Sequence, residues 1–169
     1  PLADPVALGA DKVDSASINV SWELVPGAVA YQVFRSTSEA GEFELIGEVT
    51  DSTVNSYKDT NCKIGIKYFY HVIACQQIDE TIIYGIPSNI VSGSTTPNKV
   101  NLKGSSNEEK TVASLSWNAV PDADGYEVYS KSGSDYKLVK TITDGTTSWS
   151  ESELKAESSY SYKVRAYKT

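Results

Sequence analysis

The chain has few residues of the kinds that carry catalysis or hold metal ions. Among its 169 residues are one histidine, two cysteines and no methionine. His71 stands outside any Cys-x-x-Cys, His-x-x-x-His or Gly-x-Ser-x-Gly pattern, so the motifs of zinc sites and serine hydrolases are missing. We therefore expect no catalytic, cofactor-binding or metal-binding residues. His71 is interpreted as a surface residue in the middle of a strand.

Long apolar runs are also missing. No segment approaches the roughly 18 uninterrupted apolar residues that span a bilayer. The N-terminal residues, PLADPVALGADK, lack the charged start and apolar stretch of a signal peptide. Membrane insertion is not expected.

An excess of positive charge is absent as well. Residues 1–96 hold 5 Lys and Arg against 12 Asp and Glu, and residues 97–169 hold 10 against 10, which gives a formal net charge of −7. Such a chain offers no basic stripe for phosphates, which argues against nucleic acids and anionic membranes as partners.

The two cysteines, Cys62 and Cys75, are expected to be free thiols. Cys62 precedes a strand and Cys75 lies at its far end. Seven residues of strand cover about 23 Å, whereas a disulfide needs Cα atoms within about 7 Å. Cys62 is predicted to lie in the core, and Cys75 to point outward and to be the more reactive thiol if nothing covers it.

What the chain does contain is an internal repeat rich in aromatic residues. SINVSWELVPGAVAYQVF aligns with ASLSWNAVPDADGYEVY, which pairs Trp22 with Trp117 and Tyr31 with Tyr126 at an offset of 95 residues. KYFYHVIA and SYSYKVRA align further on at an offset of 92. The repeat predicts two modules, residues 1–95 and 96–169, each with its own core.

Each copy alternates apolar and polar residues with a period of two. Ile18, Val20 and Trp22 are predicted to share one face of a strand, and the Pro26-Gly27 pair to form the next turn. No segment shows a convincing helical period. Seven short strands at this spacing favour two packed antiparallel sheets.

These residues resemble the fibronectin type III pattern. The resemblance lies in the Trp that ends the second strand, the Pro-centred turn, and Leu154 six residues before Tyr160-x-Tyr-x-Val-x-Ala, where Tyr160 takes the place of the tyrosine corner. The first copy has Cys62 and Tyr68 at these two positions. The second copy looks most like those of large bacterial secreted or wall-attached proteins.

The resemblance implies an all-β fold class, with two tandem immunoglobulin-like (fibronectin type III) β-sandwiches. The second copy ends after its Tyr160 to Ala166 strand, so we expect it to lack the last strand of the family. The resemblance also implies an extracellular or cell-surface location.

Most polar clusters and rings have a structural interpretation. The paired carboxylates are expected in turns or on outward faces, where water keeps them ionised, and Asp122-Ala-Asp124 lacks the further ligands of a calcium loop. Trp149 is expected at a sheet edge. The remaining Trp and most Tyr residues match inward positions and are predicted to be core: Trp22, Trp117, Tyr31, Tyr126, Tyr68, Tyr70, Tyr160 and Tyr162.

One outward face departs from this pattern. Phe34, Phe69 and Ile73 would bring three large apolar side chains onto neighbouring strands of the first copy, where the second copy has Tyr129, Ser161 and Arg165. Either neighbouring side chains cover them, or the three residues anchor a contact with another module or a protein partner.

Three classes of function follow from these features. The leading hypothesis is a non-catalytic extracellular spacer that holds neighbouring domains of a parent protein apart. The second is a module that binds a protein or polysaccharide ligand through the outer face or the 76–81 hairpin of the first domain. An enzyme is the third and weakest.

Overall fold

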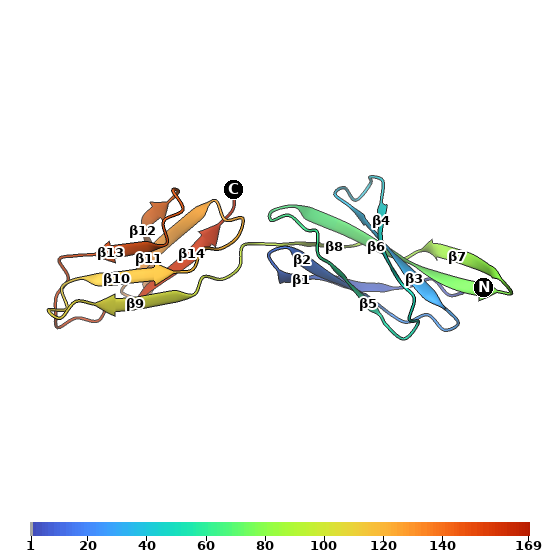
Figure 1. The fold of residues 1–169 in the computed structure, drawn as a ribbon, viewed down its shortest axis with the longest axis horizontal. Coiled ribbons are helices and arrows are strands. Elements are labelled where there is room, and N and C mark those ends of the chain that lie inside the picture. The colour runs from blue at the N-terminus through green and yellow to red at the C-terminus, as the bar shows by residue number, and fades with distance from the viewer. Residues whose placement is uncertain (1) are drawn as a thin grey trace. The chain divides into compact units, whose positions relative to one another are not determined.

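The computed structural model describes residues 2–169. The chain divides into two compact units, one up to Thr95 and one over Thr96–Thr169. Its strands follow one another with no helix between them in the described residues (Figure 1). The predicted all-β fold class is therefore confirmed. The described part of the chain holds no helix long and apolar enough to cross a membrane.

The first unit, domain 1, is a sandwich of two antiparallel sheets. One sheet has the order β1-β2-β5, and the other has the order β4-β3-β6-β7, with β8 also paired to β6. The strands are β1 (Ala7–Asp14), β2 (Ser17–Trp22), β3 (Ala30–Ser36), β4 (Glu44–Val49), β5 (Ser56–Asp59), β6 (Lys67–Ile78), β7 (Thr81–Pro87) and β8 (Val91–Ser94).

The period-2 pattern produces the core of domain 1. Ile18, Val20 and Trp22 are buried along β2, as predicted, while Asn19 and Ser21 between them are only partly covered. After β2 the chain reverses at Pro26-Gly27, where the φ of +85° at Gly27 is a backbone conformation that residues with a Cβ rarely adopt.

A tryptophan and a tyrosine meet at the centre of this core. The rings of Trp22 and Tyr31 lie 5.3 Å apart, and the backbone N–H of Val25 donates a 2.7 Å hydrogen bond to the hydroxyl of Tyr31. Burying two large rings stabilises the domain, and this hydrogen bond satisfies the tyrosine's polar end. The turn after β2 is thereby tied to β3.

The second unit, domain 2, repeats this plan with two three-stranded sheets. Their orders are β13-β10-β9 and β12-β11-β14. The strands are β9 (Leu102–Ser106), β10 (Ala113–Trp117), β11 (Gly125–Ser132), β12 (Asp135–Ile142), β13 (Ser148–Glu151) and β14 (Tyr162–Tyr167).

The repeat seen in the sequence holds at the level of single contacts. The rings of Trp117 and Tyr126 lie 5.5 Å apart, and the N–H of Val120 donates to the hydroxyl of Tyr126 over 2.8 Å. The tyrosine corners match too, because the N–H of Lys63 donates to Tyr68 over 3.0 Å and that of Lys155 to Tyr160 over 2.9 Å.

Tyr160 departs from its predicted core position. It is 42% exposed, whereas Tyr68 in domain 1 is 4% exposed. In domain 1, β8 pairs with β6 at Tyr68 and the guanidinium of Arg35 lies 4.9 Å from the Tyr68 ring. The described residues of domain 2 hold no counterpart of β8 or of Arg35 to cover Tyr160. There β14 pairs with β11, and Ser130 takes the position of Arg35.

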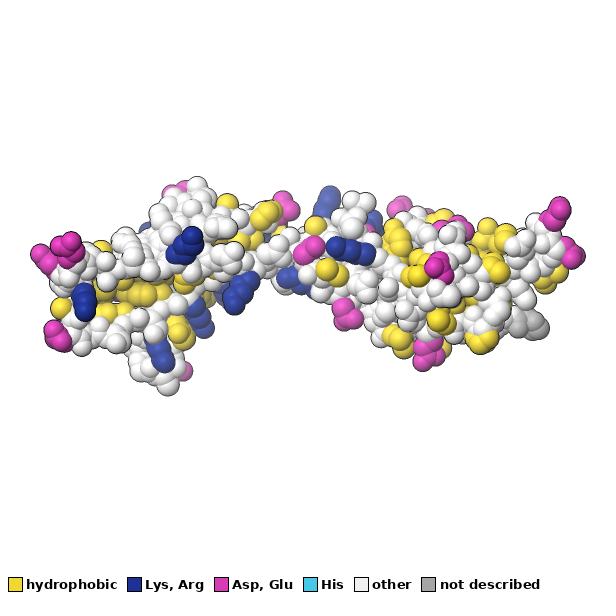
Figure 2. All heavy atoms as spheres, turned by 60° about the horizontal axis from the view of Figure 1, so that its bottom comes forward, with side chains coloured by type: hydrophobic (Ala, Val, Ile, Leu, Met, Phe, Trp, Pro, Cys, Tyr) yellow, Lys and Arg dark blue, Asp and Glu magenta, His cyan; other side chains and the backbone are white. Residues whose placement is uncertain are grey.

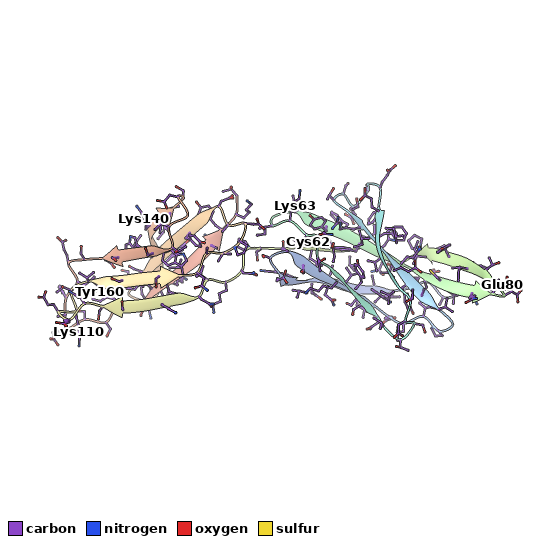
Figure 3. The ribbon with its side chains drawn as sticks, in the orientation of Figure 1. Cys62, Lys63, Glu80, Lys110, Lys140 and Tyr160 are labelled. Carbon is purple, nitrogen blue, oxygen red and sulfur yellow. The ribbon has the colours of Figure 1, made fainter. Side chains whose placement is uncertain are left out.

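A cavity of about 340 Å³ lies beside Tyr160 in domain 2. Leu115, Leu154 and Tyr162 line it together with Lys110, and Figure 3 shows Lys110 and Tyr160 at the same end of the domain. In domain 1, β8 contacts both β6 and β1 at the corresponding place. The cavity is therefore the space that a strand equivalent to β8 would fill.

Candidate functional site

The three residues of the predicted contact face lie on one sheet of domain 1. Phe34 comes from β3, and Phe69 and Ile73 come from β6. The two strands pair antiparallel, with Phe34 opposite His71 and Ser36 opposite Phe69. The topology thus brings the three together on neighbouring strands.

Neighbouring side chains cover part of this face. Phe43, just before β4, lies 4.6 Å from the His71 ring, which stacks on Phe34 at 4.9 Å. The ammonium of Lys67 lies 5.2 Å above the Phe69 ring. All three side chains of the predicted contact face are partly buried, so they expose less apolar area than the sequence pattern indicates.

His71 is not the surface residue that we predicted. Its imidazole is partly buried between Phe34 and Phe43, and its buried Nδ1 has no hydrogen-bond partner among the residues that the structure describes. This burial lowers the pKa of His71, because the charged form is poorly solvated there. Burial thus favours a neutral imidazole, which packs between the two phenyl rings.

The thiols are unpaired, as expected, but Cys75 is covered: its neighbour Ala74 belongs to the core cluster, so alternation keeps Cys75 on the outward face of β6, yet that side chain is buried. Cys62 and Cys75 are both buried, and Cys75 is 1% exposed. The β6–β7 register is irregular between Ile73 and Cys75. Burial raises the pKa of both thiols, which disfavours the reactive thiolate.

A buried polar cluster escaped the sequence analysis. Asp59, at the end of β5, accepts hydrogen bonds from the hydroxyl of Tyr70 at 2.8 Å and from the guanidinium of Arg35 at 3.0 Å. Burial acts to raise the pKa of Asp59, but hydrogen bonds from the Asn61 N–H, Tyr70 and Arg35 outweigh it, so the pKa is lowered. The cluster joins strands of the two sheets, which is a structural role.

Domain 2 keeps only part of this cluster. The Tyr162 hydroxyl donates to Glu151, as Tyr70 does to Asp59, and these pairs align in the repeat. The sequence held one signal for the missed cluster: Arg35 continues the inward alternation of Tyr31 and Val33, and a charge on an inward position needs a partner.

The acidic pairs singled out in the sequence lie at exposed positions. Asp124 accepts hydrogen bonds from the Lys168 ammonium and from Thr169. Asp122, at a φ of +60°, belongs to the turn before β11. The described residues contain no group of three or more His, Cys, Asp or Glu side chains that could hold a metal ion.

The hairpin predicted at residues 76–81 is the β6–β7 hairpin, and it carries several large exposed apolar side chains. Ile78, Tyr84 and Ile86 are exposed, and Tyr84 and Ile86 reach 58% and 60%. The turn at Asp79 and Glu80 joins the two strands, and Figure 3 shows Glu80 at the tip. Sequence reasoning located this hairpin but did not identify its exposed isoleucines.

Comparison with known proteins identifies the fold. The chain superposes on a two-domain fibronectin type III segment of chicken tenascin with a TM-score of 0.65 and 17% identity, over 99% of this chain and 93% of that one. Both units therefore have the fibronectin type III fold, as the sequence resemblance implied. No protein-family model matches the chain.

Part of the chain is also similar to bacterial amylopullulanases. The enzyme of Thermoanaerobacter thermohydrosulfuricus is 37% identical over 60 residues, and that of Thermoanaerobacterium saccharolyticum is 31% identical over 64 residues. These segments cover 36% and 38% of this chain but only 4% and 5% of the relatives. The chain thus matches a small part of much longer proteins.

Proposed function

We propose that this tandem pair of fibronectin type III domains is a non-catalytic spacer in a larger bacterial secreted or cell-surface protein. The observation that carries the proposal is the short linker. Thr95 is buried in domain 1, where its carbonyl accepts a hydrogen bond of 3.1 Å from the N–H of Gly65. Val100 is already buried in the core of domain 2. Residues 96–99 alone separate these two anchored positions.

The composition of the linker supports a stiff connection. Pro97 fixes its own φ and restricts Thr96 to extended conformations. A linker of this length also permits far less variation in reach than a long Gly/Ser-rich chain does. A stiff connection between two independently packed domains is what a spacer needs.

The comparisons support the rest of the proposal. Similarity to short segments of long bacterial enzymes is typical of an accessory module, and it suggests that a parent protein supplies any catalytic activity. Neighbouring domains of that parent are the partners the spacer would hold apart.

A distance measurement between the domains tests the spacer function. Spin labels would be attached at Glu80→Cys and Lys140→Cys, both exposed positions, while the buried native thiols stay unlabelled. We expect a distance distribution nearly as narrow as that of a control pair within domain 1, Glu80→Cys with Lys63→Cys. An insertion of about eight Gly and Ser residues after Thr96 should broaden it. If the native chain is as broad as the insertion variant, the domains are flexibly tethered and the spacer proposal fails.

The second candidate function is binding of a protein. The exposed isoleucines and Tyr84 of the β6–β7 hairpin favour it over the half-covered face of Phe34, Phe69 and Ile73. They also favour a protein over a polysaccharide, because sugars stack on flat rings and four of these five exposed side chains are isoleucines: Ile78, Ile82, Ile83 and Ile86, beside Tyr84.

A further inference from the structure

β7 is an edge strand, and no strand of the described residues pairs with its outer side. It pairs with β6 alone and ends the sheet order β4-β3-β6-β7. An edge strand presents a row of N–H and C=O groups that a further strand can bind. Pro87 lacks an N–H and closes one end of this row, so the open edge runs over Thr81–Ile86.

The side chains of β7 do not protect its edge against pairing with another strand. Natural proteins protect edges with charged residues, and Thr81–Pro87 contains none. Every other edge strand of the described residues, except the four-residue β8, carries at least one charged side chain, among them Glu44 and Glu48 of β4 at the opposite edge of the same sheet. β7 is also exposed along nearly its whole length.

A cleft beside β7 can accommodate an apolar side chain of a bound segment. It has a volume of about 300 Å³ and is lined by Leu2, Asp4, Gln76 and residues 83–86. Leu2 packs against the core, so one wall of the cleft is fixed. A strand laid along β7 could place one side chain in this cleft and others against Ile83 and Ile86.

The charge around β7 is negative. Asp4 lines the cleft, and Asp79 and Glu80 form the tip of the hairpin. Figure 2 shows acidic side chains at this end of domain 1 and hydrophobic side chains exposed on the domain. A second copy of this acidic domain would bring like charges together, whereas a segment carrying Lys or Arg would be attracted.

We propose that β7 is a docking edge for an extended segment of a partner protein, which adds to the sheet as a further strand. The segment alternates apolar with basic residues. Its main chain pairs with Thr81–Ile86, its apolar side chains lie on the isoleucines and in the cleft, and its basic side chains face Asp4, Asp79 and Glu80. This inference deepens the second candidate function and does not depend on the spacer role.

Binding of a designed peptide tests the proposal. The probe is a capped nonapeptide that alternates isoleucine and lysine, titrated into the ¹⁵N-labelled chain and followed by amide chemical shifts. We expect saturable shifts confined to β7, the hairpin tip and the cleft. A peptide that alternates isoleucine and glutamate should bind at least about tenfold more weakly. A lysine-containing peptide with proline at alternate positions cannot form a strand, so it should bind as weakly as the glutamate peptide. This control separates strand addition from general ionic attraction.

Two matched variants decide whether the edge itself binds. Ile86→Lys charges β7 at a position that is 60% exposed, so it should abolish peptide binding with the melting temperature unchanged. Leu45→Lys changes a residue that is 51% exposed on β4, and it should leave binding intact. The proposal is overturned if the lysine peptide does not bind or if Ile86→Lys binds it normally. Concentration-dependent dimerisation that Ile86→Lys abolishes would also overturn it, since the occupant would then be a second copy. None of these outcomes changes the interdomain distances that test the spacer role.

Discussion

The hydroxyl of Tyr70 on β6 donates a 2.8 Å hydrogen bond to the carboxylate of Asp59 on β5, and so ties one sheet of domain 1 to the other. Tyr162 and Glu151 form the equivalent pair in domain 2. Only Asp59 also binds an arginine, Arg35, and the two copies therefore offer a matched comparison.

Asp59→Asn should destabilise domain 1 by about 3 kcal/mol, because it leaves the Arg35 guanidinium without its carboxylate. Glu151→Gln should cost domain 2 only about 1 kcal/mol, since a single hydrogen bond is weakened there. Chemical denaturation of both variants measures the difference. Equal losses would mean that the Arg35 pair adds nothing to the cluster.

Asp59 also predicts a dependence of stability on pH. Its pKa is lower in the folded than in the unfolded domain, so its contribution is complete above the unfolded value of about 4 and is lost as the pH falls through the folded value. Denaturation of the native chain at about pH 7 and pH 3 should show this loss. Asp59→Asn should show a smaller change over the same interval.

His71 acts in a different pH window. Its folded pKa is lowered by burial, so the unfolded chain binds a proton more readily, and the stability of domain 1 should fall as the pH drops below about 6.5. His71→Phe keeps a ring between Phe34 and Phe43 but cannot be protonated. Urea midpoints at about pH 7.5 and pH 5.5 should differ in the native chain and nearly agree in the variant. An undiminished difference in the variant would assign the pH dependence to other groups.

The thiols should be inert in the folded chain. Cys62 and Cys75 are buried and have raised pKa values, so a thiol reagent such as DTNB should react very slowly under native conditions. Denaturation should expose two reactive thiols per chain. A count of none after denaturation without reductant would reveal a disulfide and contradict the placement of both residues.

Phe69→Lys separates the two interpretations of the outer face. The ring is partly covered by Lys67, so we expect the substitution to cost domain 1 no more than about 1 kcal/mol, and to abolish any association that uses this face. Tyr129→Lys on the corresponding face of domain 2 is the control. A loss of about 3 to 5 kcal/mol, as for a core truncation, would show that Phe69 is structural and would remove the case for a contact face.

The sequence predicted the features that depend on the internal repeat and on the alternation of apolar and polar residues. Trp22 with Trp117 and Tyr31 with Tyr126 were located by the repeat, and their burial followed from the period of two. Parity tells which face a side chain points to, but not what covers that face. Parity therefore predicts exposed side chains at Cys75 and His71, although Cys75 is 1% exposed and Phe43 packs on the His71 ring.

The same limit explains the remaining differences. Tyr160 has inward parity and keeps its tyrosine-corner hydrogen bond, yet it is exposed because its burial depends on a neighbouring strand and not on its own strand. The exposed edge of β7 is likewise a property of sheet order. An apolar run such as TIIYGI indicates a strand, and only the topology shows that this strand has an open side.

Differential scanning calorimetry of Trp22→Ala and Trp117→Ala tests most directly whether the chain is two domains with separate cores. Each ring is part of the core of its own domain, and its truncation should cost about 3 to 5 kcal/mol of a domain stability of about 5 to 15 kcal/mol. The account predicts that Trp22→Ala lowers the transition of domain 1 and leaves that of domain 2 in place, and that Trp117→Ala does the reverse. A single transition in which Trp22→Ala unfolds the whole chain would contradict it.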